Sequence, residues 1–355
     1  MRVRSFPGHQ VGALKPPAPA AATRSAASAL RRFARAQADA EWPLHGSAPL
    51  AVGFSGGADS TALLLAARRL WPGRALLALH VHHGLQPAAD AFAEHALRQC
   101  AHWQVECRIL PASVRVGRGD SLEEQARRAR HACLQAAARR LGCAWLLLGQ
   151  HADDQAETLL LALLRGAGPA GLAAMPAVAR RGGVCVGRPL LGCDATRLRA
   201  ELDAAGVPYV RDPMNEDASL RRVRIRRELL PALDALEPAW RRTLGRSAAL
   251  CARAAHGLRQ RAADDLQACR GAPGLRLQAL RALDAERRAE VLRAWLLEAG
   301  LRTSAAHIDN LCRQLDAPAQ RQVLVRVGAA RLWREHGWLR CSAATPTTDA
   351  TVPSL

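Results

Sequence analysis

Residues 50–60 read Leu-Ala-Val-Gly-Phe-Ser-Gly-Gly-Ala-Asp-Ser, and this stretch decides the fold. Its first five residues are a short apolar segment, which is typical of a buried strand. The following segment, 61–70, is rich in Ala and Leu and stops before Trp-Pro-Gly, as a helix does. A glycine-rich turn between a strand and a helix directs free backbone N–H groups and the helix dipole at an anion. The stretch therefore predicts a phosphate-binding loop at residues 55–60.

Apolar strands alternate with helices on the carboxyl-terminal side of this loop. The expected strands are 50–54, 75–81, 105–110, 144–149 and 184–191. The expected helices are 61–70, 90–103, 121–141, 154–165 and 194–205. This order predicts an α/β fold, a Rossmann-like parallel sheet of about five strands with helices on both faces.

The rest of the chain divides by composition. The first 35 residues contain no acidic side chain, and we expect residues 1–42 to be a disordered extension or an over-long gene start. Residues 43–215 are expected to form the ATP-binding catalytic domain and 216–245 a helical linker. Residues 246–341 are expected to form a smaller, mainly helical domain that ends in a β-hairpin of 322–327 and 331–340. The segment 342–355 is expected to be a disordered tail.

Charge is the strongest signal of the overall composition. The chain has 50 basic and 31 acidic side chains, a net charge of +19, which favours a polyanionic partner such as nucleic acid. The alternative is that the arginines form solvated helix faces. No apolar run approaches the roughly 18 residues of a membrane span, so a cytoplasmic protein is expected. The ten cysteines include no C-x-x-C pair, which indicates reduced thiols and argues against a zinc or iron–sulfur site.

The loop differs from a Walker loop in its charged residue. A Walker loop carries a lysine that neutralises the β and γ phosphates, whereas this loop supplies Asp59, which suits Mg²⁺. The expected chemistry therefore differs from γ-phosphoryl transfer. The expected ATP contacts come from the loop residues Ser55, Gly56, Gly57, Ala58, Asp59 and Ser60. The alternative is a strand-to-helix turn that needs glycine only for its shape.

A second constellation, His-Ala-Asp-Asp-Gln-Ala-Glu-Thr, occupies residues 151–158 where the fourth strand ends. Ligands bind at this edge of open α/β sheets. On a helix, Asp153 and Glu157 lie one turn apart, and their carboxylates could hold a metal ion or an ammonium group. The alternative is that acidic residues here only stabilise the helix dipole.

These motifs resemble a known family. The loop is similar to the PP-loop of the N-type ATP pyrophosphatases, which attack the α-phosphate and release pyrophosphate. Together with His-Val-His-His-Gly-Leu at 80–85, the 151–158 motif and Leu-Leu-Arg-Gly-Ala-Gly at 163–168, it resembles bacterial tRNA(Ile)-lysidine synthases over residues 52–236. The resemblance implies that ATP activates C2 of the wobble cytidine (position 34) of tRNA(Ile) with a CAU anticodon by adenylylation. Free L-lysine then displaces AMP and gives lysidine, which changes decoding from Met to Ile.

The resemblance also implies roles for single residues. Asp59 would hold Mg²⁺, the lysine amine would meet carboxylates, and arginines would bind the RNA. The implied catalytic residues are Asp59, Asp153, Asp154 and Glu157. His80 would lie beside the adenine. Lysine or tRNA would meet His151, Glu123, Arg127, Arg130, Arg188 and Arg224. A metal site of His80, His82 and His83 is not favoured, because no cysteine or acid stands at ligand spacing.

Three features depart from the family pattern. His131 stands at a usual tyrosine and Val223 at a usual asparagine. The chain is also expected to end after the first helical domain, without the additional domain of longer members.

Other functions stay open at this point. A tRNA thiolase of the PP-loop class would need paired cysteines, and a small-molecule amide synthetase of the same ATP class would not need the positive charge. A catalytically inactive RNA-binding module would not need the carboxylates. The sequence leaves the oligomeric state open, a homodimer included, as well as which arginines contact the anticodon.

Overall fold

The structure, a computed structural model, consists of two compact units. It describes residues 20–38, 40, 43–44, 46–82, 84, 89–112, 122–181, 183–211, 221–301, 303–317, 324–327 and 330–342. The division between the units falls at Ala252 and Arg253, inside helix α10 (Trp240–Cys269). It lies beyond the domain boundaries expected after residues 215 and 245, because one uninterrupted helix occupies the end of the expected linker.

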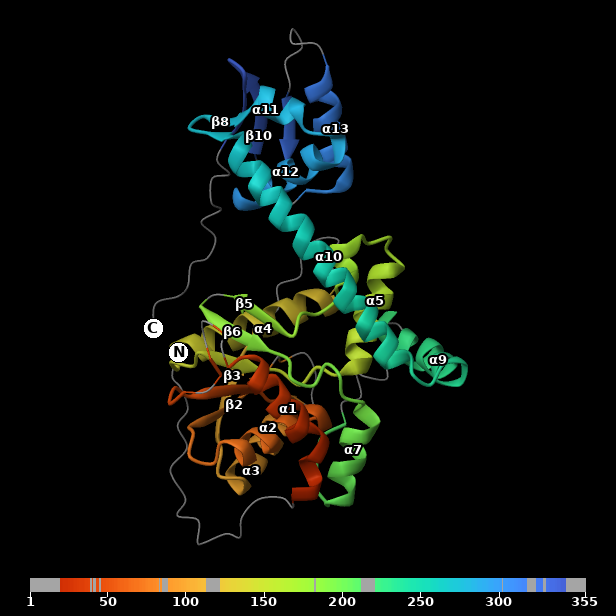
Figure 1. Ribbon diagram of the computed structural model, residues 1–355. Coiled ribbons are helices and arrows are strands. Elements are labelled where there is room, and N and C mark those ends of the chain that lie inside the picture. The colour runs from red at the N-terminus through yellow and green to blue at the C-terminus, as the bar shows by residue number, and fades with distance from the viewer. Residues whose placement is uncertain are drawn as a thin grey trace. The chain divides into compact units, whose positions relative to one another are not determined.

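A six-stranded sheet forms the centre of the N-terminal unit, in the order β3-β2-β1-β4-β6-β5 (Figure 1). The strands are β1 (Leu50–Gly53), β2 (Leu76–His82), β3 (Glu106–Pro111), β4 (Trp145–Leu147), β5 (Val178–Arg181) and β6 (Val184–Gly187). All neighbours pair in parallel except β5, which is antiparallel to β6. The α/β prediction is confirmed.

The sequence missed one strand of this sheet and overextended another. Strand β5 was not among the five expected strands, and it forms a short edge strand. The strand expected at 184–191 ends at Gly187, where Arg188 and Pro189 follow. Proline cannot donate a ladder hydrogen bond, so a central strand does not continue through it.

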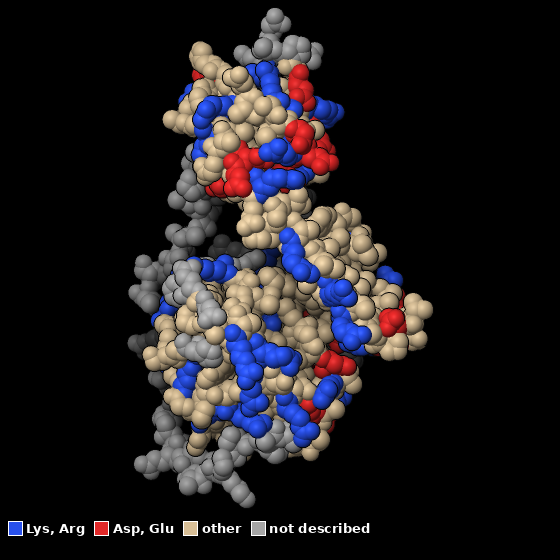
Figure 2. All heavy atoms as spheres, viewed as in Figure 1, with Lys and Arg blue, Asp and Glu red and all other residues tan. Residues whose placement is uncertain are grey.

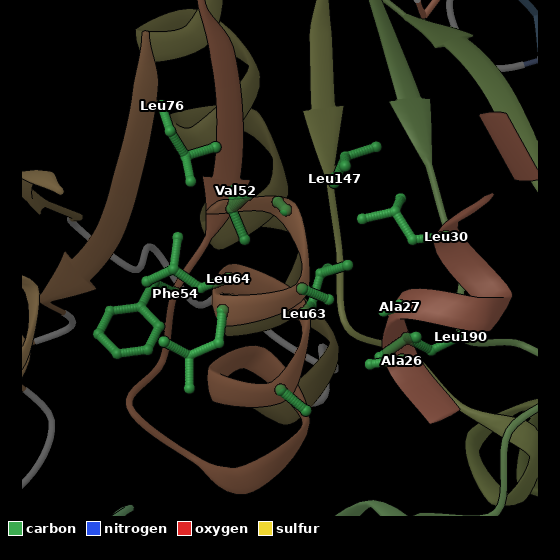
Figure 3. Close-up of a cluster of buried hydrophobic side chains, with 14 of the residues drawn as sticks. Ala26, Ala27, Leu30, Val52, Phe54, Leu63, Leu64, Leu76, Leu147 and Leu190 are labelled. Carbon is green, nitrogen blue, oxygen red and sulfur yellow. The ribbon is translucent and has the colours of Figure 1, made fainter. Parts of the chain in front are cut away.

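Helices cover both faces of the sheet. The helices of this unit are α1 (Arg24–Ala36), α2 (Ala58–Leu70), α3 (Ala89–His102), α4 (Leu122–Arg140), α5 (Ala152–Leu163), α6 (Pro169–Leu172), α7 (Ala195–Ala204), α8 (Arg221–Arg224), a π-helix (Ile225–Leu229) and α9 (Leu230–Leu236), with a 3-10 turn at Ala20–Thr23. Val52 and Leu147 pack on the side of α1 and α2 (Figure 3), while Ala51 and Leu146 pack on the side of α4. Helices therefore shield both faces of these strands from water, which explains why successive residues of the strands are apolar.

Helix α1 corrects the expectation that residues 1–42 are disordered. Leu30 is fully buried, and the Phe33 ring meets the Trp145 ring edge to face, with centroids 5.9 Å apart. A Cβ at Gly187 would lie 2.8 Å from Cζ of Phe33, so glycine at this position makes room for the ring. Ser25 donates hydrogen bonds from its N–H and its hydroxyl to Glu201 of α7. Apolar burial and these bonds hold the helix on the sheet, although its segment lacks acidic residues. Residues 1–19 lie outside the described part of the chain.

The C-terminal unit combines helices with an antiparallel sheet. Its helices after α10 are α11 (Leu277–Ala282), α12 (Ala285–Glu298) and α13 (Ala305–Asp316). Its strands are β7 (Arg270–Gly271), β8 (Gly274–Arg276), β9 (Leu324–Val327), β10 (Ala330–Glu335) and β11 (Trp338–Cys341), in the order β7-β8-β11-β10-β9. The expected hairpin is therefore part of a larger sheet. Its second strand is divided at His336 and Gly337, whose φ values of 47° and 82° form a turn.

Two further expectations concern helices and cysteines. Within the described ranges, no helix has the length and apolar character that crossing a membrane requires. All ten cysteines are free thiols. Of the expected tail at 342–355, only Ser342 belongs to the described residues.

Candidate active site

The phosphate loop lies where β1 ends and α2 begins. Gly56 has a φ of 83°, a conformation that glycine adopts without strain, and Gly57 is the N-cap of α2. The Ser60 hydroxyl donates to the Gly57 carbonyl (2.9 Å) and accepts from the Ser55 N–H (3.2 Å). These bonds fix a tight turn at the amino end of a 13-residue helix. The turn has the geometry of an anion cradle.

The backbone of Asp59, in the loop, lies close to the segment that follows β4. A Cβ at Gly149 would lie 3.1 Å from backbone atoms of Asp59 and Ser60, so the two segments approach closely. Burial raises the pKa of the Asp59 carboxyl, and the nearby His151 acts in the opposite direction. Within the described residues, the buried Oδ1 atom of Asp59 makes no hydrogen bond. Asp59 thus offers an unused carboxylate oxygen beside the phosphate cradle.

His151 lies at the centre of three carboxylates. Its Nε2 is 3.6 Å from Oδ2 of Asp59 and 3.5 Å from Oδ2 of Asp154, and its Nδ1 is 3.7 Å from Oδ2 of Asp153. Oδ2 of Asp154 also accepts from the His151 N–H (3.1 Å), which begins helix α5. The structure therefore brings Asp59 together with the 151–158 motif, because β1 and β4 are neighbours in the sheet.

Two arginines that the sequence did not single out bind the carboxylates of α5. Nε of Arg226 donates to Glu157 (2.8 Å), and Nε of Arg241 donates to Asp153 (2.6 Å). Glu157 is fully buried, and burial raises its pKa although Arg226 acts to lower it. Asp153 and Glu157 were expected to hold one incoming cation between them. In the structure each of these carboxylates binds a different arginine of the protein instead.

Arg224 pairs with a carboxylate outside the cluster around His151. Arg224 forms an exposed ion pair with Glu228, four residues further along the chain. Arg222 instead donates to the Thr158 hydroxyl (3.4 Å), on the same helix as Glu157. Positions 222 and 226 share a helix face, whereas 224 lies about 200° around. This i, i+4 spacing was a signal that could have identified Arg226.

The remaining predicted residues lie at varying distances from the cluster. Arg130 interacts electrostatically with Asp154, and burial lowers its pKa. Nη2 of Arg127 lies 3.6 Å from the sulfur of Met175, and Nη1 of Arg188 donates to the Pro176 carbonyl (3.0 Å). The ring of His80 is buried, with Nδ1 2.9 Å from the Phe54 carbonyl oxygen. The side chain of Glu123 and all of His83 lie outside the described residues.

A separate pocket opens at the carboxyl end of α5, whereas the cluster lies at its amino end. It has a volume of about 400 Å³ and lies between the end of α5 and the α8–π-helix segment. Leucines and an isoleucine form its apolar lining, Arg165, Arg221 and Arg224 supply positive charge, and Glu228, the partner of Arg224, supplies one negative charge. Apolar surface together with guanidinium groups suits a base and its phosphate. No group of three or more His, Cys, Asp or Glu in the described ranges has metal-site geometry.

Two family models match the chain, one in each part. The PP-loop domain model matches residues 26–233, and the TilS substrate binding domain model matches residues 275–340. The tRNA(Ile)-lysidine synthase of Polaromonas naphthalenivorans is 45% identical, over 85% of this chain and 92% of its own length. The chain belongs to the tRNA(Ile)-lysidine synthase family. As a member it is an ATP-dependent ligase that modifies tRNA, which confirms the prediction from the motifs.

Other members of the lysidine synthase family match in the same way. The protein of Chromobacterium violaceum is 44% identical over 72% of this chain and 59% of its own length. That of Ralstonia nicotianae is 39% identical over 90% of this chain and 71% of its own length. Among solved structures, the U34-tRNA thiolase NcsA of Methanococcus maripaludis has a TM-score of 0.54 and 16% identity, over 64% of this chain and 78% of its own. This last likeness concerns the fold alone.

Proposed function

We propose that the chain activates C2 of cytidine 34 in tRNA(Ile) with a CAU anticodon by adenylylating its carbonyl oxygen and then joins free L-lysine to that carbon, in the cytoplasm. The observation that carries the proposal is the meeting of two motifs around His151. Asp59 of the phosphate loop and Asp153 and Asp154 of α5 all lie within 3.7 Å of its ring nitrogens. One site therefore combines an ATP cradle with carboxylates suited to an amine.

The phosphate loop serves the first half-reaction. Loop N–H groups and the dipole of α2 would hold the pyrophosphate, which leaves as the carbonyl oxygen on C2 attacks the α-phosphate. Asp59 fits Mg²⁺, because its Oδ1 is without a partner among the described residues and Mg²⁺ commonly takes one or two carboxylates plus substrate phosphates. Bound Mg²⁺ would neutralise charge on the phosphates. Such a site needs no protein cage of three ligands.

The α5 carboxylates serve the second half-reaction. Glu157 is fully buried on Arg226, so its role is to orient that arginine. Asp154 is more accessible, with a side chain 21% exposed, and Oδ2 of Asp153 is not used by Arg241. These oxygens would hold the lysine ε-ammonium and take up one of its protons, so that the neutral amine attacks C2 and AMP leaves with the oxygen that C2 carried. The partly exposed guanidinium of Arg226 is suited to the α-carboxylate of lysine.

Positive charge on the N-terminal unit serves the RNA. Basic side chains gather on the face of this unit shown in Figure 2. The pocket lined by Arg165, Arg221 and Arg224 would take a nucleotide of the anticodon loop beside the modified base. Binding through phosphates would make tRNA affinity strongly dependent on salt.

The deciding assay supplies ATP, radiolabelled lysine and tRNA(Ile) with a CAU anticodon. Label should enter the tRNA, and a matched tRNA with uridine at position 34 should take up none. Absence of label in the CAU tRNA would overturn the proposal. A sulfur donor that replaces lysine as the incorporated group would instead identify a thiolase.

Two variants separate the half-reactions. Asp59→Asn should abolish pyrophosphate release, because the loop loses its charged Mg²⁺ ligand. Asp154→Asn should keep pyrophosphate release without lysine and raise the KM for lysine. An Asp154→Asn enzyme with the wild-type KM would show that the carboxylate assignment is wrong.

A further inference from the structure

The start of α10 reaches into the proposed lysine site through Arg241. This residue is the second of the helix, and its Nε donates to Oδ1 of Asp153 at 2.6 Å. The two side chains are 21% and 11% exposed, so the pair is largely shielded from water. A charge-assisted bond of this length in a shielded setting is stronger than a surface ion pair.

Arg241 is itself braced from the other side. Its Nη1 and Nη2 bind the two oxygens of Asp234, at 2.5 and 3.4 Å. The buried indole N–H of Trp240 donates to the same carboxylate (2.8 Å), and the Arg241 guanidinium lies over the Trp240 ring, 4.3 Å from its centroid. The planar guanidinium of Arg241 is thus held by Asp153 at Nε, by Asp234 at its two Nη atoms and by the Trp240 ring at its face. It therefore has little rotational freedom.

The two oxygens of Asp153 face different partners. Oδ1 is taken by Arg241, while Oδ2 lies toward His151, 3.7 Å from Nδ1. Rotation about the Cβ–Cγ bond would exchange the oxygens, and Arg241 opposes this rotation. The carboxylate therefore presents one oxygen to the cluster that contains Asp59 and Asp154.

We propose that Arg241, braced by Asp234 and Trp240, is a positioning residue that aims Oδ2 of Asp153 at the lysine ammonium. This inference rests on the proposed function. It gives the end of the expected linker, residues 234–241, a direct part in the second half-reaction. The bonds of Arg241 run to Asp153 and to Asp234, so it acts on lysine through Asp153.

The test compares Arg241→Ala with Arg242→Ala. Arg242 is the neighbouring exposed residue on the same helix, and its variant removes the same charge without touching Asp153. Arg241→Ala should raise the KM for lysine at least about tenfold, since it removes a charged hydrogen bond. Pyrophosphate release with tRNA and without lysine should stay within about twofold of wild type. Arg242→Ala should leave the KM for lysine unchanged.

Asp234→Asn provides a second variant with little risk to folding, because the Asp234 side chain is 48% exposed. It keeps an acceptor for Trp240 and loses the charge that braces Arg241, so the KM for lysine should rise by a smaller factor, about threefold. An unchanged KM in Arg241→Ala would overturn the inference. An equal loss in both half-reactions, or an equal effect of Arg242→Ala, would overturn it as well. An unchanged KM for lysine in Asp234→Asn would overturn the role of Asp234 in holding Arg241.

Calorimetric titration with lysine separates this inference from the proposed function. A wild type that binds lysine without transferring it would overturn the function, while tenfold weaker binding by Arg241→Ala would still support the positioning role. A wild type that binds no lysine would overturn both.

Discussion

Removal of Arg226 should destabilise the N-terminal unit in a pH-dependent way. Arg226→Met leaves the Glu157 carboxylate fully buried without its 2.8 Å partner. An unpaired buried carboxylate that stays ionised costs about 3–5 kcal/mol. Taking up a proton instead costs about 3.7 kcal/mol at pH 7, for an unfolded-state pKa of about 4.3. The variant takes whichever state costs less, so its free energy of unfolding should be about 3–4 kcal/mol below that of the wild type at neutral pH.

The sign of the pH dependence follows from proton binding. Burial already raises the pKa of Glu157, and loss of Arg226 removes the nearest group that lowers it. Above pH 4.3 the unfolded chain releases the proton that the folded variant keeps, so stability falls as pH rises. The penalty should therefore shrink by about 1.4 kcal/mol per pH unit toward acid, to about 1 kcal/mol at pH 5.

The assay is a urea titration at pH 5, 6 and 7, followed by hydrogen exchange of peptides from α5, which lies wholly in the N-terminal unit. The matched control is the double variant Glu157→Met and Arg226→Met, which removes both charges. It should recover most of the stability and show no pH dependence specific to this pair. A penalty that is equal at pH 5 and pH 7, or a double variant as unstable as Arg226→Met, would refute the reasoning.

Three further variants test other parts of the structure. Phe33→Ala should lower the free energy of unfolding by about 3 kcal/mol in the same urea assay, because it leaves a cavity between α1 and Gly187. An unchanged free energy of unfolding would mean that α1 does not stabilise the sheet. Gly149→Ala places a Cβ 3.1 Å from the backbone of Asp59 and Ser60 and should slow pyrophosphate release at least about tenfold, while Gly192→Ala, with nothing within 4 Å, should not. Arg165→Ala should weaken tRNA binding and reduce the slope of log affinity against log salt by about 1 without changing the KM for lysine, and an unchanged slope would remove Arg165 from the RNA surface.

The fold was predictable where its signals are local. The strand at 50–53 and the helix that follows are both specified within about 20 residues, because apolar runs and glycine punctuation act at that range. Helix α1 carried a signal as well, since Ala26, Leu30 and Phe33 recur at helical spacing. The absence of acidic residues argued for disorder instead. What decided the outcome was the space that Gly187 leaves for Phe33, which no local pattern reveals.

The two motifs of the site were predictable from the sequence, but the arginines that bind their carboxylates were not. Each motif was predicted at the carboxyl end of a strand, and the pairing of β1 with β4, which the sequence did not predict, brings Asp59 and His151 to one edge of the sheet. The arginines were different, because Arg226 and Arg241 lie 69 and 88 residues from the carboxylates that they bind. Spacing along the chain says nothing about partners at such a separation. The roles of the individual side chains in lysine and tRNA binding stay predictions.

The docking of α1 also bears on how the chain folds while it is being made. Ser25 bonds to Glu201, 176 residues later, and Phe33 rests on Gly187. Ribosomes add about 5–20 residues per second, so α1 waits roughly 10–30 s for these partners to be synthesised. During that interval Leu30 and Phe33 lack the part of their binding surface that β6 and α7 supply. Helix α1 thus leaves the ribosome well before the last of its partners, and nascent-chain chaperones would meet its apolar face in that interval.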